Sequence, residues 1–384
     1  MDRRRFLQAG LGTAATAGLA GPAMTTMLRN SPPRPTVGEL PPRRPPAYSL
    51  IPVVGDGYWI DNDPPKGAEG YYHPRLFEAR IGIEMEGTGR ATKIRATTPV
   101  PVEYPEQKFE DFSLETSGCE AAVRPLADTA AELVLASPGL VEGGKLRAMA
   151  NFRLKLTKQY LGFVKDQFPA EQTAPREVQR QYLGNSPGIQ TLSREVRTLS
   201  KKLADGADHP WDQIKKFVAW IRGNIRGRVG AYTHVLTALE KKEGDCEEMA
   251  AVLVALCRSA QIPARLVWVP NHNWTEVYLA DGEGQGHWVP VHTGCYSWFG
   301  WTGAHELVLQ KGDRIALKEK RSQTRLLCDW ARWVGAAPKI RFIAELRPIA
   351  STEGEDPGPG ARSKTATGEW KLVGNHEFDR YARR

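Results

Sequence analysis

A chain of 384 residues is long enough for two folded units, since a domain commonly has about 100–200 residues. Its 41% hydrophobic and 25% charged residues exclude a wholly disordered chain and a protein with many membrane spans. The formal net charge of +8 is moderately basic, but lysine and arginine form no clustered stripe of the kind that binds nucleic acid. We therefore expect no nucleic-acid partner.

Residues 1–30 resemble a twin-arginine export signal. The run Arg3-Arg4-Arg5 is followed by Phe6-Leu7, and a weakly apolar stretch extends from Ala9 to Leu28. Weak hydrophobicity behind an arginine pair is typical of twin-arginine signals, whereas signals of the general secretory route are more apolar. We expect export to the periplasm or the extracellular space. An uncleaved anchor is the alternative, and the membrane would then be contacted only through this segment.

Residues 31–70 are rich in proline and predict an extended linker. Residues 71–165 instead contain short runs in which apolar and polar residues alternate, such as Arg80–Met85 and Glu132–Leu135. This alternation is typical of half-buried strands, and the glycines and prolines between the runs mark turns. The sequence therefore predicts a β-rich antiparallel domain over residues 71–165.

A second unit, which we place at residues 190–350, begins with helices. Apolar residues recur at helical spacing over 193–203 and from Pro210 to Gly223, and proline suits a first helical turn. A further helix is expected to start after Gly244-Asp245 and to end before Pro263. Strands are predicted at 264–269, 274–280 and 287–291, with 281–286 as a hairpin loop, and candidate strands at 307–310 and 340–346. The polar residues 351–384 predict a flexible tail.

Cys246 is the candidate nucleophile. It follows Gly244-Asp245 and opens a run of helix formers, so its sulfur is expected in the first turn of a helix. Backbone N–H groups and the helix dipole favour a thiolate there, which lowers a cysteine pKa. His272 precedes a strong strand, and a helix packed on a sheet can bring the start of that strand to its own N-terminus. A thiol beside an imidazole base is the arrangement that acyl transfer needs.

Four stretches extend this pattern. Gly244-Asp245-Cys246 opens the helix, and Arg258-Ser259-Ala260-Gln261-Ile262-Pro263-Ala264-Arg265 follows it. The strands then contain His272-Asn273-Trp274-Thr275-Glu276-Val277-Tyr278-Leu279 and His287-Trp288-Val289-Pro290-Val291-His292. In this order they resemble the transglutaminase-like superfamily, closely over about residues 240–295. The resemblance implies an α+β fold, with an N-terminal antiparallel β-domain before a papain-like core whose cysteine helix packs on an antiparallel sheet.

The family uses a Cys-His-Asp triad, so the resemblance assigns Cys246 as the nucleophile and His272 as the base. His292 stands where the family has its aspartate. Pairing across the 281–286 loop would set position 292 opposite 272 within a residue or two, so its ring can reach His272. A neutral histidine can fix the tautomer of the base but supplies no charge, so we expect a slower or retuned enzyme. Further candidates for the third position are Asn271, Asn273 and Asp313.

The activity that the resemblance implies is acyl transfer at an amide, with no cofactor. Hydrolysis of a peptide or isopeptide bond is expected rather than cross-linking, on a peptide or protein substrate. The alternative is a catalytically weak or inactive binding or scaffold protein of the cell envelope. We expect no metal site, because His287 and His292 would point to opposite faces of a strand and neither C-x-x-C nor H-E-x-x-H occurs.

Several residues near the site have more than one interpretation. The backbone N–H of Cys246 is one oxyanion donor by position, and Trp220 and Tyr232 are either the source of a second donor or core residues. Cys295 could line the site, pair with Cys328 or be buried, whereas Cys257 is expected to be inert inside the helix. Five tryptophans in this region either wall an acyl groove or form a Trp-rich core, and Trp298 and Trp301 are the better groove candidates; the others are Trp268, Trp274 and Trp288. Glu276 is expected to form an ion pair with Arg265.

Overall fold

The computed structural model of the chain describes residues 48–49, 70–127, 129–160, 165–228, 232–270, 272–293, 299–302, 305–317, 322–349, 363–364 and 370–371. The predicted signal segment lies outside these residues, as do nearly all of the predicted linker and tail. Asn271, Cys295 and Trp298 also lie outside them, and so does the side chain of Trp301.

One sheet is made of long strands from the N-terminal half and a strand from near the C-terminus. Its order is β1-β18-β2-β7-β13, and β4 pairs with β7 as well. The bounds are β1 Tyr48–Ser49, β2 Gly70–Glu86, β4 Gln107–Ser117, β7 Lys145–Tyr160, β13 Trp301–Thr302 and β18 Lys339–Pro348. Odd positions of β2 from Phe77 to Met85 are buried beside even positions of β7 from Leu146 to Leu156. The predicted alternation is therefore present, with the apolar set on one face.

A second sheet has the order β12-β11-β10-β14-β6-β3-β17, with β5 on β6. The bounds are β3 Ala91–Val100, β5 Glu120–Ala127, β6 Ala130–Leu140, β10 Ala264–Val269, β11 His272–Ala280, β12 Gly286–Val291, β14 Gln310–Lys311 and β17 Trp330–Gly335. The short β14 pairs with both β10 and β6. It thereby joins the hairpin strands of the C-terminal half to the strands of the N-terminal half in one continuous sheet.

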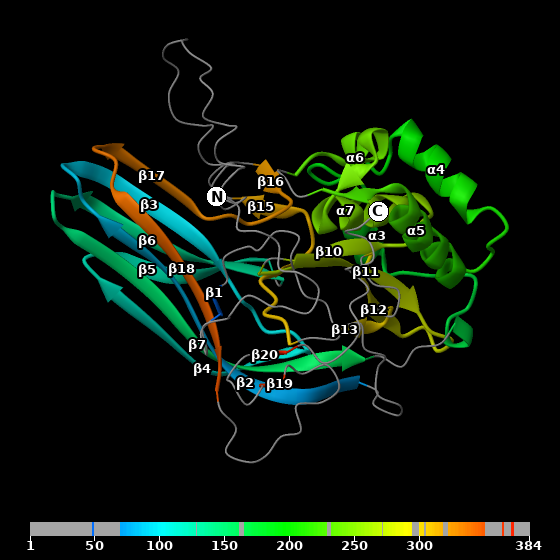
Figure 1. Cartoon of the computed structure of the whole chain (residues 1–384), viewed down its shortest axis with the longest axis horizontal. Coiled ribbons are helices and arrows are strands. Elements are labelled where there is room, and N and C mark those ends of the chain that lie inside the picture. The colour runs from blue at the N-terminus through cyan, green and yellow to red at the C-terminus, as the bar shows by residue number, and fades with distance from the viewer. Residues whose placement is uncertain are drawn as a thin grey trace, which may run out of the picture.

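The two sheets pack face to face around an apolar core that draws on β2, β3, β6 and β7 (Figure 1). Two late strands complete them, because β17 pairs with β3 and β18 pairs with β2. The predicted strand at 340–346 is confirmed as part of β18, whereas 307–310 contributes only its last residue to a strand. The boundaries proposed at 71–165 and 190–350 remain predictions.

The helices gather at one end of this second sheet (Figure 1). They are α3 Arg176–Tyr182, α4 Arg194–Ala204, α5 Pro210–Asn224, α6 Val235–Lys241 and α7 Cys246–Ser259. The short elements are η2 Lys165–Gln167, β8 Arg226–Gly227, β9 Glu243–Gly244, β15 Ile315–Leu317, β16 Ser322–Thr324, β19 Ser363–Lys364 and β20 Trp370–Lys371. The expected starts at Ser193 and Pro210 are confirmed: Ser193 Oγ accepts from the Val196 N–H of α4, and Pro210 is the first residue of α5.

Helix α7 lies on β10 and β11 and is covered on its other sides by α4, α5 and α6. Its residues are therefore buried all round from Ala250 to Arg258, rather than along a single apolar face. The architecture confirms the α+β prediction, with mostly antiparallel sheets. Within the part of the chain that the structure describes, we find no helix with the length and apolar character needed to span a membrane.

Candidate active site at the start of helix α7

Cys246 is the first residue of α7 and is half-buried. The helix start is held by a capping box. Asp245 Oδ1 accepts from the Glu247 N–H at 2.9 Å, and Glu248 Oε2 accepts from the Asp245 N–H at 2.9 Å. The other Glu248 oxygen accepts from the Thr233 N–H at 2.7 Å. The turn that presents the thiol is thus fixed both within the helix and to the segment before α6.

One hydrogen bond joins this helix to the strand that begins with His272. The Thr275 hydroxyl donates to the Ala250 carbonyl at 3.1 Å, and both groups are buried. Ala250 lies about one helical turn after Cys246, and Thr275 lies three residues after His272. Because β10 and β11 pair with Val269 opposite His272, the histidine stands at the hairpin end of the sheet. Cys246 and His272 therefore lie toward the same end of the helix–sheet layer.

His272 and His292 lie together. Their ring centroids are 5.6 Å apart and the ring planes are within 14° of parallel. The register of β11 on β12 ends with Thr275 opposite Val291, so His292 comes beside Trp274, whose ring lies 5.0 Å away at 20°. His272 is on the same side of β11 as Trp274, with the two rings 6.1 Å apart. The position where the family has aspartate thus faces the predicted base, although the two rings lie nearly parallel.

Both histidines are neutral near pH 7. Burial lowers the pKa of His272 from 6.5 to about 3. Burial also lowers the pKa of His292 well below 6.5, and the positive charge that His272 could carry lowers it further. A neutral imidazole can accept a proton from a thiol, but this environment disfavours the imidazolium that results. Any ion pair formed with a cysteine thiolate would have to overcome this cost.

Farther along the same face of β11 lies a buried group of four charges. Arg265 Nη2 is 2.7 Å from Glu276 Oε2, which confirms the expected ion pair. Lys311 Nζ bridges Glu276 and Glu106 at 2.7 Å each. These two cations hold the pKa of Glu276 below its usual value although burial acts in the opposite sense. Because the positive and negative charges balance, this group adds little net charge toward the histidines.

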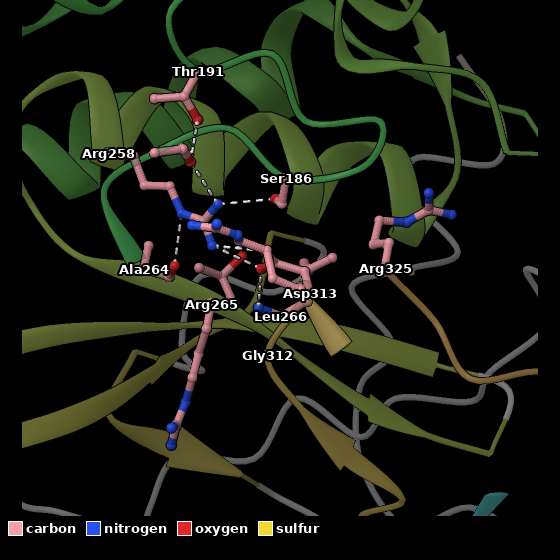
Figure 2. A network of polar contacts seen from close by, with 12 residues as sticks. Ser186, Thr191, Arg258, Ala264, Arg265, Leu266, Gly312, Asp313 and Arg325 are labelled. Carbon is pink, nitrogen blue, oxygen red and sulfur yellow. Dashed lines mark hydrogen bonds and ion pairs between the residues drawn. The ribbon is translucent and has the colours of Figure 1, made fainter. Parts of the chain in front are cut away.

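Asp313 is not the third member of the site. Figure 2 shows its carboxylate against Arg258, with both oxygens 2.8 Å from Nη2. Arg258 also donates to the Gly184 and Ala264 carbonyls and to the Ser186 hydroxyl, at 2.9–3.0 Å. Arg258 lies twelve residues after Cys246, which is about 18 Å along a helix. The candidacy of Asp313 for the triad was therefore wrong, since it anchors the far end of α7.

The other candidates have different positions. Asn273 is buried opposite Trp268 in β10, on the face of β11 that alternation turns away from Trp274. The Tyr232 hydroxyl donates to the Gly188 carbonyl at 2.9 Å, which commits its proton to the backbone rather than to an oxyanion. Trp220 is partly buried against the helical core. Cys257 is fully buried, and burial raises the pKa of its thiol, in line with the expected inertness.

The structure adds two contacts to the description of the site. Arg325 forms an ion pair with Glu247, the residue after Cys246, and its guanidinium carbon lies 3.4 Å from the Tyr232 ring centroid. The second contact is the stacking of Trp274 on His292. The only sequence signal for this contact is the two-residue spacing from His272, which puts both on one face. Among the described residues, no three histidine, cysteine, aspartate or glutamate side chains gather as metal ligands.

The comparisons with known proteins give one family match and likenesses to solved structures. Residues 197–293 match the family model of the transglutaminase-like superfamily. No curated protein sequence matches the chain. A solved structure of a candidate cysteine protease from Cytophaga hutchinsonii shares 14% identity, with a TM-score of 0.49, over 73% of this chain and 99% of that one. The periplasmic domain of TgpA from Pseudomonas aeruginosa, bound to ethylmercury, shares 15% identity, with a TM-score of 0.27, over 60% and 91%. At such values these likenesses say nothing about activity.

The chain therefore contains a transglutaminase-like superfamily domain, and α7, β10, β11 and β12 form its core.

Proposed function

We propose that the protein is a cysteine acyl-transfer enzyme that acts on peptide or isopeptide amides, with Cys246 as the nucleophile and His272 as the base. The observation that supports the proposal is the Thr275–Ala250 hydrogen bond, which joins α7 to β11 near the ends that begin with Cys246 and His272. A cysteine at a helix N-terminus and a neutral imidazole at the adjoining strand end are the groups that thiol catalysis requires. The transglutaminase-like domain spans both residues.

The reaction proceeds in two halves. Cys246 Sγ attacks the amide carbonyl carbon while His272 takes the thiol proton. His272 passes that proton to the departing amine as the C–N bond breaks, which leaves a thioester. Water then attacks the thioester, His272 takes a proton from it, and the C–S bond breaks as the thiol is restored. The Cys246 backbone N–H stabilises the oxyanion in both halves. Since water is always present, we favour hydrolysis over transfer to an amine.

Labelling with iodoacetamide tests the nucleophile. Cys246 in the intact protein should react selectively near pH 7, and Cys246→Ala should abolish the reaction. Cys119→Ala and Cys328→Ala are matched controls, because both thiols are half-buried like that of Cys246. Burial also raises the pKa of Cys119, so it should react slowly. If Cys246 reacts no faster than these two thiols, the enzyme proposal fails and a binding or scaffold role takes its place.

Exchange of His292 for aspartate tests the third position. In a serine triad, loss of the acid lowers kcat about 10⁴-fold, and a cysteine enzyme should depend on it less because a thiol is already acidic. We expect His292→Asp to raise turnover of peptide or isopeptide substrates. A loss of turnover would instead assign His292 a role that aspartate cannot fill. The corresponding measurement of amine incorporation separates hydrolysis from cross-linking.

We also propose export by the twin-arginine route, from the Arg3–Leu7 run and the weakly apolar stretch behind it. Conversion of Arg4 and Arg5 to lysine should retain the protein in the cytoplasm of a bacterial host, as measured by fractionation. The matched control converts Arg43 and Arg44, a second arginine pair in the proline-rich segment, and should leave export unchanged. Equal export of both variants would contradict the proposal.

A further inference from the structure

Trp274 has contacts of two kinds. Its ring stacks on His292 at 5.0 Å and lies 6.1 Å from His272. It is only 3% exposed and also belongs to a separate small apolar cluster. The other buried members of this cluster are Tyr104, Val267, Val269 and Val308. The indole thus contacts the two histidines and belongs to a small apolar cluster that is distinct from the main helical core.

Tyr104 is the member of this cluster that comes from the β-rich N-terminal region, between β3 and β4. It is 6% exposed, and its hydroxyl donates to the Thr129 carbonyl at 2.8 Å. Its backbone pairs with that of Gln107 in both directions, at 2.9 and 3.0 Å. The Gln107 side chain in turn donates to the Val308 carbonyl and accepts from the Val308 N–H, at 2.9 Å each. The tyrosine ring is therefore held firmly against the sheet that carries His272.

We propose that Tyr104 and Trp274 position the His272 ring. In a triad, an aspartate orients the histidine by hydrogen bonding; here, aromatic packing that includes a residue of the N-terminal β-rich region orients it. This inference rests on the proposed function of Cys246 and His272. Both residues act through the histidine pair, and neither needs to touch the substrate. The β-rich region is then a part of the catalytic site and not an appended module.

The stack can perform only part of an aspartate's task. Packed aromatic rings fix the plane of a neighbouring ring, and they exclude water from one of its faces. They supply no negative charge, so the imidazolium gains no stabilisation and the base remains neutral, in line with the lowered pKa of His272. The same packing thus accounts for both the orientation and the protonation state of the base.

Most charged groups on the elements around the stack are in ion pairs. Those on the elements packed around His272 and Trp274 are Asp245, Glu247 and Glu248 at the start of α7, Arg325 on Glu247, Arg265 in β10, Glu276 in β11, Lys311 in β14 and Glu106 beside Tyr104. Six of these eight groups are in ion pairs with one another, and the Asp245 and Glu248 carboxylates accept hydrogen bonds from backbone N–H groups at the start of α7. The pH response of the site should then depend mainly on how dry the histidine pair is, and this is the property that Tyr104 and Trp274 control.

The test compares Tyr104→Leu with Tyr182→Leu in the full-length protein. Tyr182 is a matched control, because it is also 6% exposed and packs edge-on against an aromatic ring, Trp288, at 4.9 Å. Trp288 pairs with Tyr278, six residues along β11 from His272. Tyr104→Leu should lower kcat about tenfold with KM unchanged, the upper end of what one aromatic contact supplies. Tyr104→Phe, which keeps the ring, should recover most of the rate.

The pH profile separates positioning from mere stability. Hydration through the gap left by Tyr104→Leu should raise the pKa of His272 toward 6.5, so the acid limb of kcat against pH should move upward. Tyr182→Leu should lower the melting temperature without moving that limb. If Tyr104→Leu does not fold, Trp274→Phe replaces it, with the same upward shift expected from the smaller ring.

Two outcomes overturn the inference. One is an acid limb that stays in place in Tyr104→Leu or Trp274→Phe, and the other is an equal fall of kcat in Tyr182→Leu. Either leaves the proposed function intact, provided that Cys246 of the unchanged protein reacts selectively. An unreactive Cys246 in the unchanged protein is a failure of the proposed function itself, so the two failures are distinguishable.

Discussion

Replacement of Asp313 by asparagine would leave the Arg258 guanidinium buried without an opposing charge. The exposed fractions of the two side chains are 0% and 1%, so water cannot compensate. The remaining partners of Arg258 are two carbonyls and a hydroxyl, which are neutral acceptors. Loss of one member of a buried ion pair costs about 3–5 kcal/mol. Since a folded protein is stable by only about 5–15 kcal/mol, a large part of the stability should be lost.

Urea unfolding followed by tryptophan fluorescence would measure this loss. Glu86→Gln is the control, because its ion pair with Lys339 is exposed at the surface and should be worth at most about 1 kcal/mol. The double variant Arg258→Met, Asp313→Leu should recover part of the loss, since it removes the unpaired charge. A loss below about 1 kcal/mol in Asp313→Asn would refute the reasoning, because the pair would then be hydrated or replaceable.

Three further predictions concern the site and its surroundings. Because the pKa of His272 is lowered to about 3 in the folded state, the unfolded chain binds a proton more readily than the folded one. The free energy of unfolding should therefore be largest above pH 6.5 and fall by about 2 kcal/mol by pH 5. Urea unfolding at both pH values should show this fall. The His272→Gln variant should show a smaller fall, because it lacks the contribution of His272. Asp245→Ala should cost about 1 kcal/mol and slow iodoacetamide labelling of Cys246, whereas Ser193→Ala, which removes the cap of α4, should cost about the same without slowing it. Lys311→Met should cost about 3–5 kcal/mol at pH 7, because Glu106 and Glu276 would then face only Arg265. The cost should be less at pH 5, because protonation of one carboxylate removes the excess negative charge; a loss independent of pH would contradict this explanation.

Much of the fold follows from local patterns in the sequence. The alternation in Arg80–Met85 predicts a strand because one face of β2 packs on the core. Pro210 and the Gly244-Asp245 pair predict helix starts because they satisfy or remove the N–H groups that a first turn leaves open. Arg265 and Glu276 were predicted as partners, and they lie directly opposite in paired strands. Each of these features depends on residues that are close in the chain or joined by one hairpin.

The residues of the candidate site can be predicted from the sequence to the same extent. The placement of Cys246 at a helix start and His272 at a strand start follows from the order of helix formers and strand formers around them. The contact of His292 with His272 follows from hairpin register. Asp313 was misjudged because its partner Arg258 lies 55 residues earlier and no local pattern joins them. The match of residues 197–293 to the transglutaminase-like superfamily supports the domain, while the roles of the three site residues remain predictions.

Local patterns are enough to predict the helix that presents Cys246, the hairpin that carries His272 and His292, and the β-rich character of the first half, since periodicity, caps and turns act over a few residues. The pairing of β14 with strands of both halves, and the apolar cluster that Tyr104 and Trp274 share, are seen only in the folded structure. Such contacts join segments more than a hundred residues apart. They form because buried apolar surface and paired charges outweigh the entropy lost in closing these long loops, and that balance is a property of the whole fold.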